Sequence, residues 1–552
     1  MNARKAIWWT VTSIIVTALN IWAWWVLKAP FDLHSKTTWW EAIIWIACIG
    51  IAGLIVSYID EEVSVFSRNE NPYLWPSIVT ILAVVLWVAY LIARLFSSNA
   101  LNAQSRYEMV ADAVQVIEDG DGVSAFPNLL GSNNDTSNLP LLGTPEAIKN
   151  AETLMGSQPA LGSQYELLEE EVTSQNIGNS LMYVVPLEPK SWIKWDGNNH
   201  GYFIIDRNNG TTTFVEEGLV TTEKAPFGDN AIRVIYDYMS HNHISGRITE
   251  LSPEVDDDGN FKYVATVYET SGVDGMHTVT GVVELDATDK TCQYYSLDEV
   301  PPYIDRVFPE TIFQEYIKYY GEYKNGWLNS FIGQKEVLVP TNGSDIVYID
   351  GTCWYYTGFT SAGKGESSNG IIMMNCRTGE IKYFITYGIS EEKAMGIAEG
   401  RVQEKGYKAS YPLLLMVGGQ ETYFMLMRDA NNNICAYAFV SYKDYTKAAV
   451  AESLSTAQTQ YIKATGTSNS ADILDDLALS KGRAVITAIG SEVKEGSTLW
   501  YIMLDGNEHI FTLTSAMEPN IVFAETGDMA EISYIEAESQ VVSAIEVSID
   551  IN

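Results

Sequence analysis

The sequence predicts an N-terminal bundle of three transmembrane helices, a soluble α+β body and a C-terminal all-β small barrel. Three observations lead to this fold class. Three apolar spans lie within the first 99 residues, an excess of acidic residues follows them, and strand and helix patterns alternate from about residue 181. Each span is close to the ~20 residues that a helix needs to cross the hydrocarbon of a bilayer. We therefore expect an integral membrane protein with a large water-soluble part.

The predicted membrane spans are residues 6–27, 39–59 and 74–93. Ten of the 15 Trp residues lie in residues 1–99, and five of them flank the two ends of the first span, as interfacial aromatic belts require. The first span lacks a small-residue cleavage site, so we interpret it as a membrane helix and not as a signal peptide. The lipid bilayer is thus an expected partner, contacted through residues 6–93.

The positive-inside rule does not by itself fix the orientation of this anchor. With the N-terminus inside, three Lys or Arg residues flank the spans on the inner side and four on the outer side, and the reverse topology reverses the count. Arg4 and Lys5 form a compact cluster before the first helix, and this cluster favours an inside N-terminus. Three spans then place the soluble part outside the cytoplasm.

The charge imbalance lies almost entirely in the soluble part. Of 34 Lys/Arg and 70 Asp/Glu residues, six of each lie in residues 1–99, which leaves 28 basic and 64 acidic residues and a net charge of −36. Such a surface repels phosphate backbones and anionic headgroups, so we expect no nucleic-acid partner. Solubility explains the charge most simply. A domain held near a membrane without adhering to it, or a binder of cationic groups, stays open.

Three segments of the body share one pattern, an apolar strand, an Asp or Asn, a short turn and a strand ending in aromatic residues. The turn residues are Asp206, Asp286 and Asn375. Asp and Asn suit these turns because their side chains bond nearby backbone groups. A helix pattern follows each hairpin, and the three helices are expected at 229–241, 309–320 and 390–405. The repeated unit is therefore a hairpin followed by a helix, which is an α+β design.

The third unit also carries a family resemblance. Residues 378–381 (Thr-Gly-Glu-Ile) and 389–394 (Ile-Ser-Glu-Glu-Lys-Ala) resemble PepSY-type modules, which implies a helix packed on a small antiparallel sheet. The longer stretch from 300–309 (Val-Pro-Pro-Tyr-Ile-Asp-Arg-Val-Phe-Pro) to 411–415 (Tyr-Pro-Leu-Leu-Leu) is similar to an uncharacterised family of bacterial and phage multi-pass membrane proteins. Membership implies an N-terminal anchor, for which we expect the bacterial inner membrane. It implies no established activity.

These patterns divide the chain into five segments. They are a transmembrane anchor, a helical neck with helices near 105–117 and 144–156, the PepSY-like repeats, a helix at 442–462 with a polar linker, and the barrel. Their bounds are 1–99, 100–180, 181–445, 446–480 and 481–552.

The last segment is similar to a small barrel of the oligonucleotide/oligosaccharide-binding (OB) fold. Five or six short apolar runs in about 70 residues, separated by turn signals, suit such a barrel. Acidic residues outnumber Lys481, Arg483 and Lys494, although nucleic-acid binding needs a basic face with aromatic residues. We therefore predict a structural or protein-binding barrel.

Two clusters are candidates for covalent or metal chemistry. If the strands around Cys353 and Cys376 form a hairpin, the two thiols face each other within reach of a disulfide; a bridge and two buried thiols both stay open, because sequence does not fix the register. Asp256, Asp257 and Asp258 resemble the acidic residues of a calcium-binding loop. The loop lacks the glycine and glutamate positions of a calcium-binding loop, so it predicts a hairpin turn, with weak calcium binding as the alternative.

No established catalytic or cofactor motif occurs in the sequence. Gly-x-Ser-x-Gly, His-Glu-x-x-His, Cys-x-x-Cys and the dinucleotide glycine motif are all absent. The loop at 358–365 has the glycine spacing and lysine of a phosphate-binding loop, but a Gly replaces the magnesium-binding Ser/Thr and a strand follows. His241 and His243 lack a third ligand at metal-binding spacing. We therefore expect no cofactor and assign no catalytic residue.

The sequence thus favours a membrane-anchored, non-enzymatic binding or scaffold protein that presents an acidic domain at an envelope surface. Its expected partner is another protein or a second copy of the chain. Two alternatives stay open. One is a subunit of an oligomeric membrane transport or channel assembly, and the other is a hydrolase with a dispersed acidic site.

Overall fold

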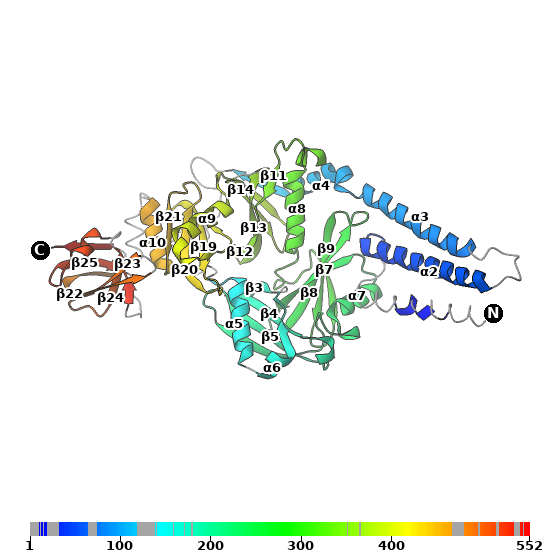
Figure 1. Ribbon diagram of the computed structural model, residues 1–552, viewed down its shortest axis with the longest axis horizontal. Helices are drawn as coiled ribbons and strands as arrows, with labels where there is room; N and C mark the ends of the chain where they lie inside the picture. The colour runs from blue at the N-terminus through cyan, green and yellow to red at the C-terminus, as the bar shows by residue number, and fades with distance from the viewer. Residues whose placement is uncertain are drawn as a thin grey trace.

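The computed structural model places an apolar helical pair, a body of sheets and a C-terminal sheet one after another along its long axis (Figure 1). It describes residues 32–63, 74–118, 141–465 and 480–551, together with positions 10, 13–14, 16–18 and 139. Short gaps interrupt these ranges, and they fall at 158, 170–171, 178–179, 350, 364–365, 495–496, 515–517, 535–540 and 545.

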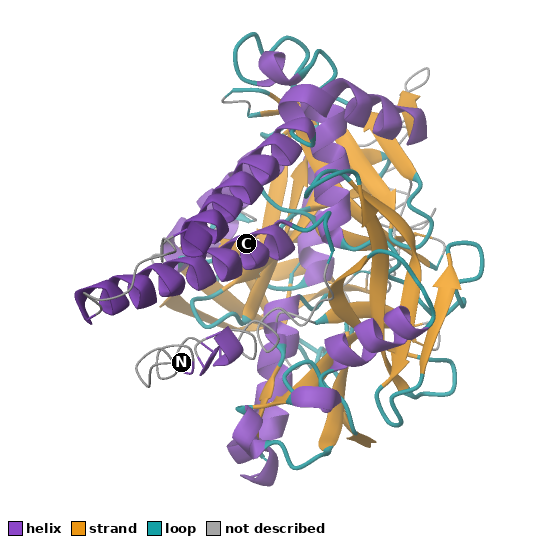
Figure 2. Cartoon of the chain, turned by 90° about the vertical axis from the view of Figure 1, so that its right-hand side faces the viewer, coloured by secondary structure: helices purple, strands orange, loops and turns teal. Residues whose placement is uncertain are grey.

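Two long apolar helices form the N-terminal part, α2 (Lys36–Val63) and α3 (Leu74–Phe96). They pack against each other and project from the body (Figure 2). Among the described residues, Lys36–Ile55 and Pro76–Ala113 are long and apolar enough to cross a membrane. The predicted spans 39–59 and 74–93 are therefore confirmed as apolar helices. Six positions of the span 6–27 are described, all helical, and the rest lies outside the described residues, so a three-helix bundle is not established.

The body contains four sheets, each built mainly from antiparallel strands that are neighbours in the chain. The first sheet consists of β2 (Tyr165–Leu167), β3 (Thr173–Ile177), β4 (Ser180–Pro189), β5 (Asn199–Asp206) and β6 (Thr212–Leu219). The second consists of β7 (Arg247–Val255), β8 (Phe261–Thr270), β9 (His277–Asp286) and β10 (Cys292–Ser296).

The third and fourth sheets continue this design. The third is built on β11 (Leu338–Pro340), β12 (Asp345–Ile349), β13 (Thr352–Ser361), β14 (Ser367–Asn375), β15 (Ile381–Ile385) and β16 (Gly388–Ile389). The fourth consists of β17 (Lys408–Ala409), β18 (Leu413–Val417), β19 (Gln420–Arg428), β20 (Ile434–Ser441) and β21 (Ala448–Ala451).

All three predicted hairpins are confirmed, and their turns share one hydrogen-bond pattern. The side chains of Asp206, Asp286 and Asn375 each accept a bond from the N–H two residues later. The carbonyl of each accepts the N–H four residues later, and its N–H donates to the carbonyl five residues later. Turns of this kind are fixed by local sequence, so they could be predicted without knowledge of the rest of the fold.

The predicted helices after these hairpins are also present, as α7 (Ala231–His241), α8 (Glu310–Glu322) and α9 (Glu391–Arg401). Each helix packs on the sheet that follows it in the chain, and α5 (Thr144–Gly156) packs on the first sheet in the same way. The predicted chain order, a helix after each hairpin, is therefore confirmed, but the helix does not pack on the hairpin that precedes it. The packed unit is a helix followed by its meander, because the apolar face of each helix meets strands later in the sequence.

The four units are numbered by their sheets, and the fourth consists of α9 and the fourth sheet. Its last strand forms from residues of the predicted helix 442–462. Residues Ala448–Ala451 form β21, which pairs with β20, and α10 (Leu454–Thr465) packs on both strands. An Ala-rich run favours a helix intrinsically. Here pairing with the sheet outweighs that preference and buries Ala448 and Ala449.

The predicted neck, 100–180, is only partly helical. Its first helix is α4 (Asn99–Ala113), which follows α3 after the extended residue Ser98, and the short α6 (Pro159–Gln164) follows α5. Residues Val114–Glu118, which overlap the end of the predicted helix 105–117, form β1 instead. This strand pairs in parallel with β15 of the third sheet. Three of its five residues are β-branched, so strand geometry suits the segment better than a helix does.

The helical pair is fixed to the loop between β8 and β9. Arg94, in the last turn of α3, donates to the carbonyl of Val273 at 3.0 Å and lies 3.3 Å from a carboxylate oxygen of Asp274. The N–H of Val273 donates to Ser97 Oγ at 2.8 Å. Gly272 has φ +68°, and a Cβ atom there would lie 2.2 Å from the same hydroxyl. This loop therefore needs a glycine where it meets the foot of α3.

The C-terminal segment is a six-stranded sheet at the far end of the molecule from the helical pair (Figure 1). Its order is β26-β24-β23-β22-β25-β27, and the long β22 pairs with both β23 and β25. The predicted all-β character is confirmed, whereas the described strands do not form a closed barrel. The strands are β22 (Ser480–Lys494), β23 (Ser497–Leu504), β24 (Ile510–Thr514), β25 (Met529–Tyr534), β26 (Val541–Ser543) and β27 (Glu546–Asp550).

Candidate functional site

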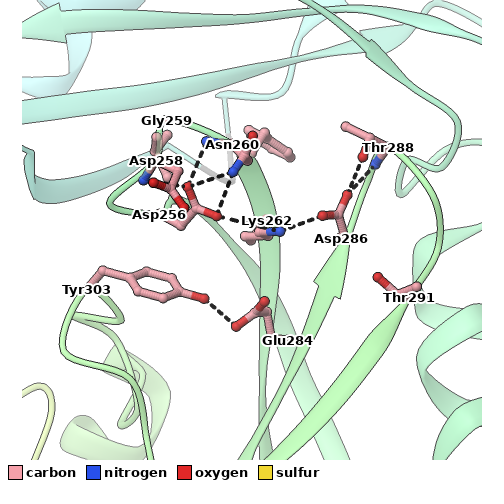
Figure 3. Close-up of polar contacts among 12 residues, drawn as sticks. Asp256, Asp258, Gly259, Asn260, Lys262, Glu284, Asp286, Thr288, Thr291 and Tyr303 are labelled. Atoms are coloured by element: carbon pink, nitrogen blue, oxygen red, sulfur yellow. Dashed lines mark hydrogen bonds and ion pairs between the residues drawn. The ribbon is translucent and has the colours of Figure 1, made fainter.

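The acidic run at 256–258 forms the turn between β7 and β8 (Figure 3). Asp256 Oδ1 accepts the N–H groups of Asp258 at 3.0 Å and Asn260 at 2.8 Å. Burial raises the pKa of Asp256, but hydrogen bonds from Asn260 and the charge of Lys262 outweigh it, so the pKa lies below its ordinary value. This carboxylate is therefore already engaged by its own turn.

A lysine joins this turn to the next hairpin. Lys262 Nζ lies 3.6 Å from Asp256 Oδ2 and 2.5 Å from Asp286 Oδ2, and Tyr303 donates to Glu284 close by (Figure 3). Within the part of the chain that the structure describes, no group of three or more His, Cys, Asp or Glu side chains could hold a metal ion. The network ties two turns together, and calcium binding at Asp256, Asp257 and Asp258 stays a prediction.

Cys353 and Cys376 lie opposite each other, as the predicted hairpin requires. Trp354 of β13 pairs with Asn375 of β14, which brings the neighbouring cysteines face to face. Their Sγ atoms are 2.9 Å apart, and both residues are buried as thiols. The centre of this hairpin, at 364–365, lies outside the described residues.

Among the described residues, His241 and His243 belong to no group of three or more metal-binding side chains. His241 Nδ1 lies 2.6 Å from the carbonyl of Asp237 in the last turn of α7. His243 has φ +57° and belongs to the turn that follows. Gly358 is part of β13, where a Cβ atom would lie 2.3 Å from Glu391 Oε1. The glycine at 358 thus makes room for a buried carboxyl.

Glu391 is the buried acid behind this glycine, in the first turn of α9. Burial raises its pKa to about 7, against the opposing effect of the hydroxyls of Thr341 and Tyr423. An open cavity of about 950 Å³ lies between α9 and the end of β11, and Thr341, Ser390, Glu392 and Lys393 are among its lining residues. The carboxyl of Glu391 is not in that lining. Its position fits a contact between α9 and β13 better than a reaction with a bound molecule.

A second, smaller cavity of about 240 Å³ lies where the first, third and fourth units meet. The first unit contributes the start of α5, Tyr183 and Arg207, the third contributes Asp345 and Tyr356, and the fourth contributes Ser410, Tyr411 and Arg428. Sequence reasoning missed this site because its residues come from distant segments and follow no motif.

Arg207 gives this cavity its distinctive chemistry. The residue is 3% exposed, its Nη1 donates to Ser174 Oγ at 2.8 Å, and its guanidinium lies 4.7 Å from the centre of the Tyr183 ring. Its Nε has no hydrogen-bond partner among the described residues. Because an unpaired buried donor is costly, this atom favours a bound acceptor, either a water molecule or a ligand oxygen.

The other charges around the cavity are partly compensated. Arg428 forms an ion pair with Glu146 of α5, and its Nη2 lies 3.1 Å from Glu146 Oε2. Glu146 also accepts the N–H of Gly143 at 3.0 Å, which caps α5. Asp345 adds a carboxylate to the lining. With two guanidinium groups, the carboxylate of Asp345 and the hydroxyls of Tyr183 and Tyr411, the cavity suits a small polar ligand that has both donors and acceptors.

Comparisons with known proteins do not identify a family. No family model matches the sequence, and no curated protein matches it. Among solved structures, an endo-1,5-α-L-arabinanase from Thermotoga petrophila RKU-1 is similar at TM-score 0.19 and 12% identity, over 69% of this chain and 98% of that one. An α-L-arabinofuranosidase from Lactobacillus brevis has TM-score 0.17 and 8% identity, over 67% and 92%.

A mutant apocarotenoid oxygenase from Synechocystis has TM-score 0.13 and 8% identity, over 50% of this chain and 48% of that one. The chain therefore spans about half of the length of that protein. Similarity at this level carries no conclusion about function.

Proposed function

We propose that this chain is a membrane-anchored, non-enzymatic binding or scaffold protein that presents an acidic body at an envelope surface. The exposed apolar surface of α2 and α3 is the observation that supports it most. Ile81 is 60% exposed and Leu95 is 57% exposed on α3, and Ile51 is 51% exposed on α2. Exposing such a surface to water costs roughly 25 cal/mol per Å². Lipid removes that cost, whereas a soluble helix would bury one apolar face.

The third span, the orientation and the location in this proposal are taken from the sequence. Residues 6–27 provide a third span, the N-terminus lies in the cytoplasm, and the body lies outside a bacterial inner membrane. The helix-and-meander units agree with the PepSY resemblance. We also propose that the C-terminal sheet is an OB-like barrel. Its two edge strands, β26 and β27, are consecutive in the chain, and this connection supports a sheet that curves toward closure.

The binding role is assigned to the body. Its cavity around Arg207 offers a buried unpaired donor to a small polar ligand, and the acidic surface offers a contact to a partner protein or a second copy. Replacing Arg207 with Met should keep the volume of the side chain and remove its donors. A small polar ligand recovered with the wild-type body should then be lost from this variant.

Liposome flotation tests the proposed anchoring. The purified full-length chain, freed of detergent by dialysis with liposomes, should float with the lipid and resist extraction at alkaline pH. A chain that stays dispersed in buffer without detergent and does not float would contradict the proposal. A separate assay tests the proposed lack of enzymatic activity. Turnover of generic esters, glycosides or peptides by the full-length protein would contradict that part of the proposal.

A further inference from the structure

The two opposed cysteines of the third sheet are close enough to bond. Cys353 lies in β13, and Cys376 directly follows the last residue of β14. The N–H of Cys376 donates to the carbonyl of Cys353 at 2.9 Å, which fixes the two backbones side by side, and the Sγ atoms are 2.9 Å apart. Directly opposed residues of antiparallel strands bring their Cβ atoms within the range that a disulfide spans.

The pair also lies at the joint between the second and third units. The carbonyl of Cys376 accepts the N–H groups of Val307 at 3.0 Å and Phe308 at 2.7 Å. Arg377, the next residue, donates to carbonyls of the preceding linker at Val300, Pro301 and Ile304. A covalent link at this point would hold together the two strands onto which the linker docks.

The other three cysteines lie in different elements. Cys48 belongs to α2, Cys292 to β10 of the second sheet and Cys435 to β20 of the fourth sheet. Each is partly exposed, whereas Cys353 and Cys376 are 1% and 0% exposed. Among the five cysteines, the geometry therefore selects one pair.

We propose that Cys353 and Cys376 form a structural disulfide when the protein meets a disulfide oxidant. One cysteine, as its thiolate, attacks a sulfur of the oxidant and forms a mixed disulfide. The first attack breaks the disulfide of the oxidant and releases one of its sulfurs as a thiol. The second thiolate then attacks the chain sulfur of the mixed disulfide and releases the other sulfur, so the oxidant leaves as two thiol groups with the two electrons and the two thiol protons. Because the native pair is buried, exchange occurs while β13 and β14 pair and before the linker covers them, or during local opening.

The proposed bridge rests on the register of β13 and β14 and not on the membrane proposal. A chain that carries it in cells would have its body in an oxidising compartment, which agrees with an extracytoplasmic location. A membrane anchor and a reduced pair could still occur together, so the two proposals can fail separately.

Peptide mapping tests the bridge directly. Full-length protein in detergent is reduced, freed of reductant and held in a mixture of oxidised and reduced glutathione, at a temperature just below unfolding so that buried thiols become accessible. After acid quenching, the denatured chain is alkylated and digested with trypsin, which cleaves after Lys364 and so separates the two cysteines. We expect a linked peptide pair that contains Cys353 and Cys376 and lacks the mass of two hydrogen atoms. Alkylation of both cysteines throughout, or a link to Cys292 or Cys435, would overturn the proposal.

Thermal unfolding gives a second readout and a control. Reductant should lower the Tm of the oxidised wild type by several degrees, because the closed loop restricts the unfolded chain. The variant Cys292→Ala should respond like the wild type, and the double variant C353A/C376A should show no response to reductant. If the double variant does not fold, the peptide map of the wild type still decides. An oxidised wild type with the same Tm in both conditions would contradict a stabilising bridge.

Discussion

The burial of Glu254 predicts that the body loses stability as the pH rises through neutrality. Glu254 is 1% exposed at the end of β7, and its carboxylate oxygens accept the N–H groups of Asp305 at 3.0 Å and Arg306 at 3.1 Å. Burial and the nearby charge of Asp305 raise its pKa from 4.5 to about 8, although the two backbone bonds oppose the rise. The folded protein therefore holds this proton to higher pH than the unfolded chain does.

The sign and the size of the effect follow from proton linkage. Between pH 4.5 and about 8 the folded state binds one proton more than the unfolded state at this group, so the free energy of unfolding falls as the pH rises. The stabilisation is complete below pH 4.5 and is lost above about 8. One pKa unit corresponds to about 1.4 kcal/mol, so the whole shift is worth about 5 kcal/mol, of which about 2–3 kcal/mol is lost between pH 6 and 8.

Pulse proteolysis in urea at pH 6 and pH 8 measures this change on the full-length chain. The comparison uses Glu254→Gln, which cannot ionise, and the control Glu269→Gln on the exposed part of β8. Burial also raises the pKa of three other carboxyls, those of Glu188, Asp305 and Glu391. These groups lower the free energy of unfolding with rising pH in every variant alike, so only the difference between variants reports on Glu254. The wild type and E269Q should lose about 2–3 kcal/mol more than E254Q over this range. Equal slopes for all three proteins, or a wild type that gains stability toward pH 8, would refute the reasoning.

Three further predictions concern the joints of the molecule and its anchor. Gly272→Val forces a Cβ against Ser97 and a strained backbone, so limited proteolysis should cut the β8–β9 loop faster than in the wild type; equal cleavage rates would contradict the tight contact. Arg428→Met leaves Glu146 buried without its partner and should cost about 3–5 kcal/mol in urea unfolding, while the double variant E146M/R428M should cost clearly less; the reverse order would show that the pair is not a buried one. Leu82→Arg on the exposed face of α3 should raise the cost of insertion by roughly 2.5–3.5 kcal/mol and lower the fraction that floats with liposomes, and unchanged flotation would place this face away from lipid.

The parts of the fold that the sequence predicted are those set by short stretches of chain. The apolar helices α2 and α3 could be read from length and composition, and the turn at Asp206 from its local hydrogen bonding. The helix cap at Ser390, whose side chain accepts the N–H of Lys393, is equally local. In each case the residues that decide the structure lie within a few positions of one another.

The features that the sequence did not predict depend on distant segments. Strand β1 pairs with β15 although most of the sequence of the body lies between them, and the side chains of Glu146 and Arg428 meet although 282 positions separate them in the chain. Neither contact has a local pattern. The same holds for the Arg207 cavity, because the 64 acidic residues after residue 99 allow many possible partners and only the packing of three units brings Asp345 to this cavity. The order of helix and meander likewise depends on which sheet each apolar face meets.

Photochemical cross-linking in a bilayer tests the central claim most directly. The full-length protein is reconstituted into liposomes that contain a phospholipid with a photoactivatable group in its acyl chain, irradiated and mapped by mass spectrometry. The account predicts lipid adducts on exposed apolar residues of α3 such as Ile81, Val85 and Leu95, and none on β22–β27. Adducts absent from both α2 and α3, or concentrated in the C-terminal sheet, would contradict a membrane anchor formed by these helices.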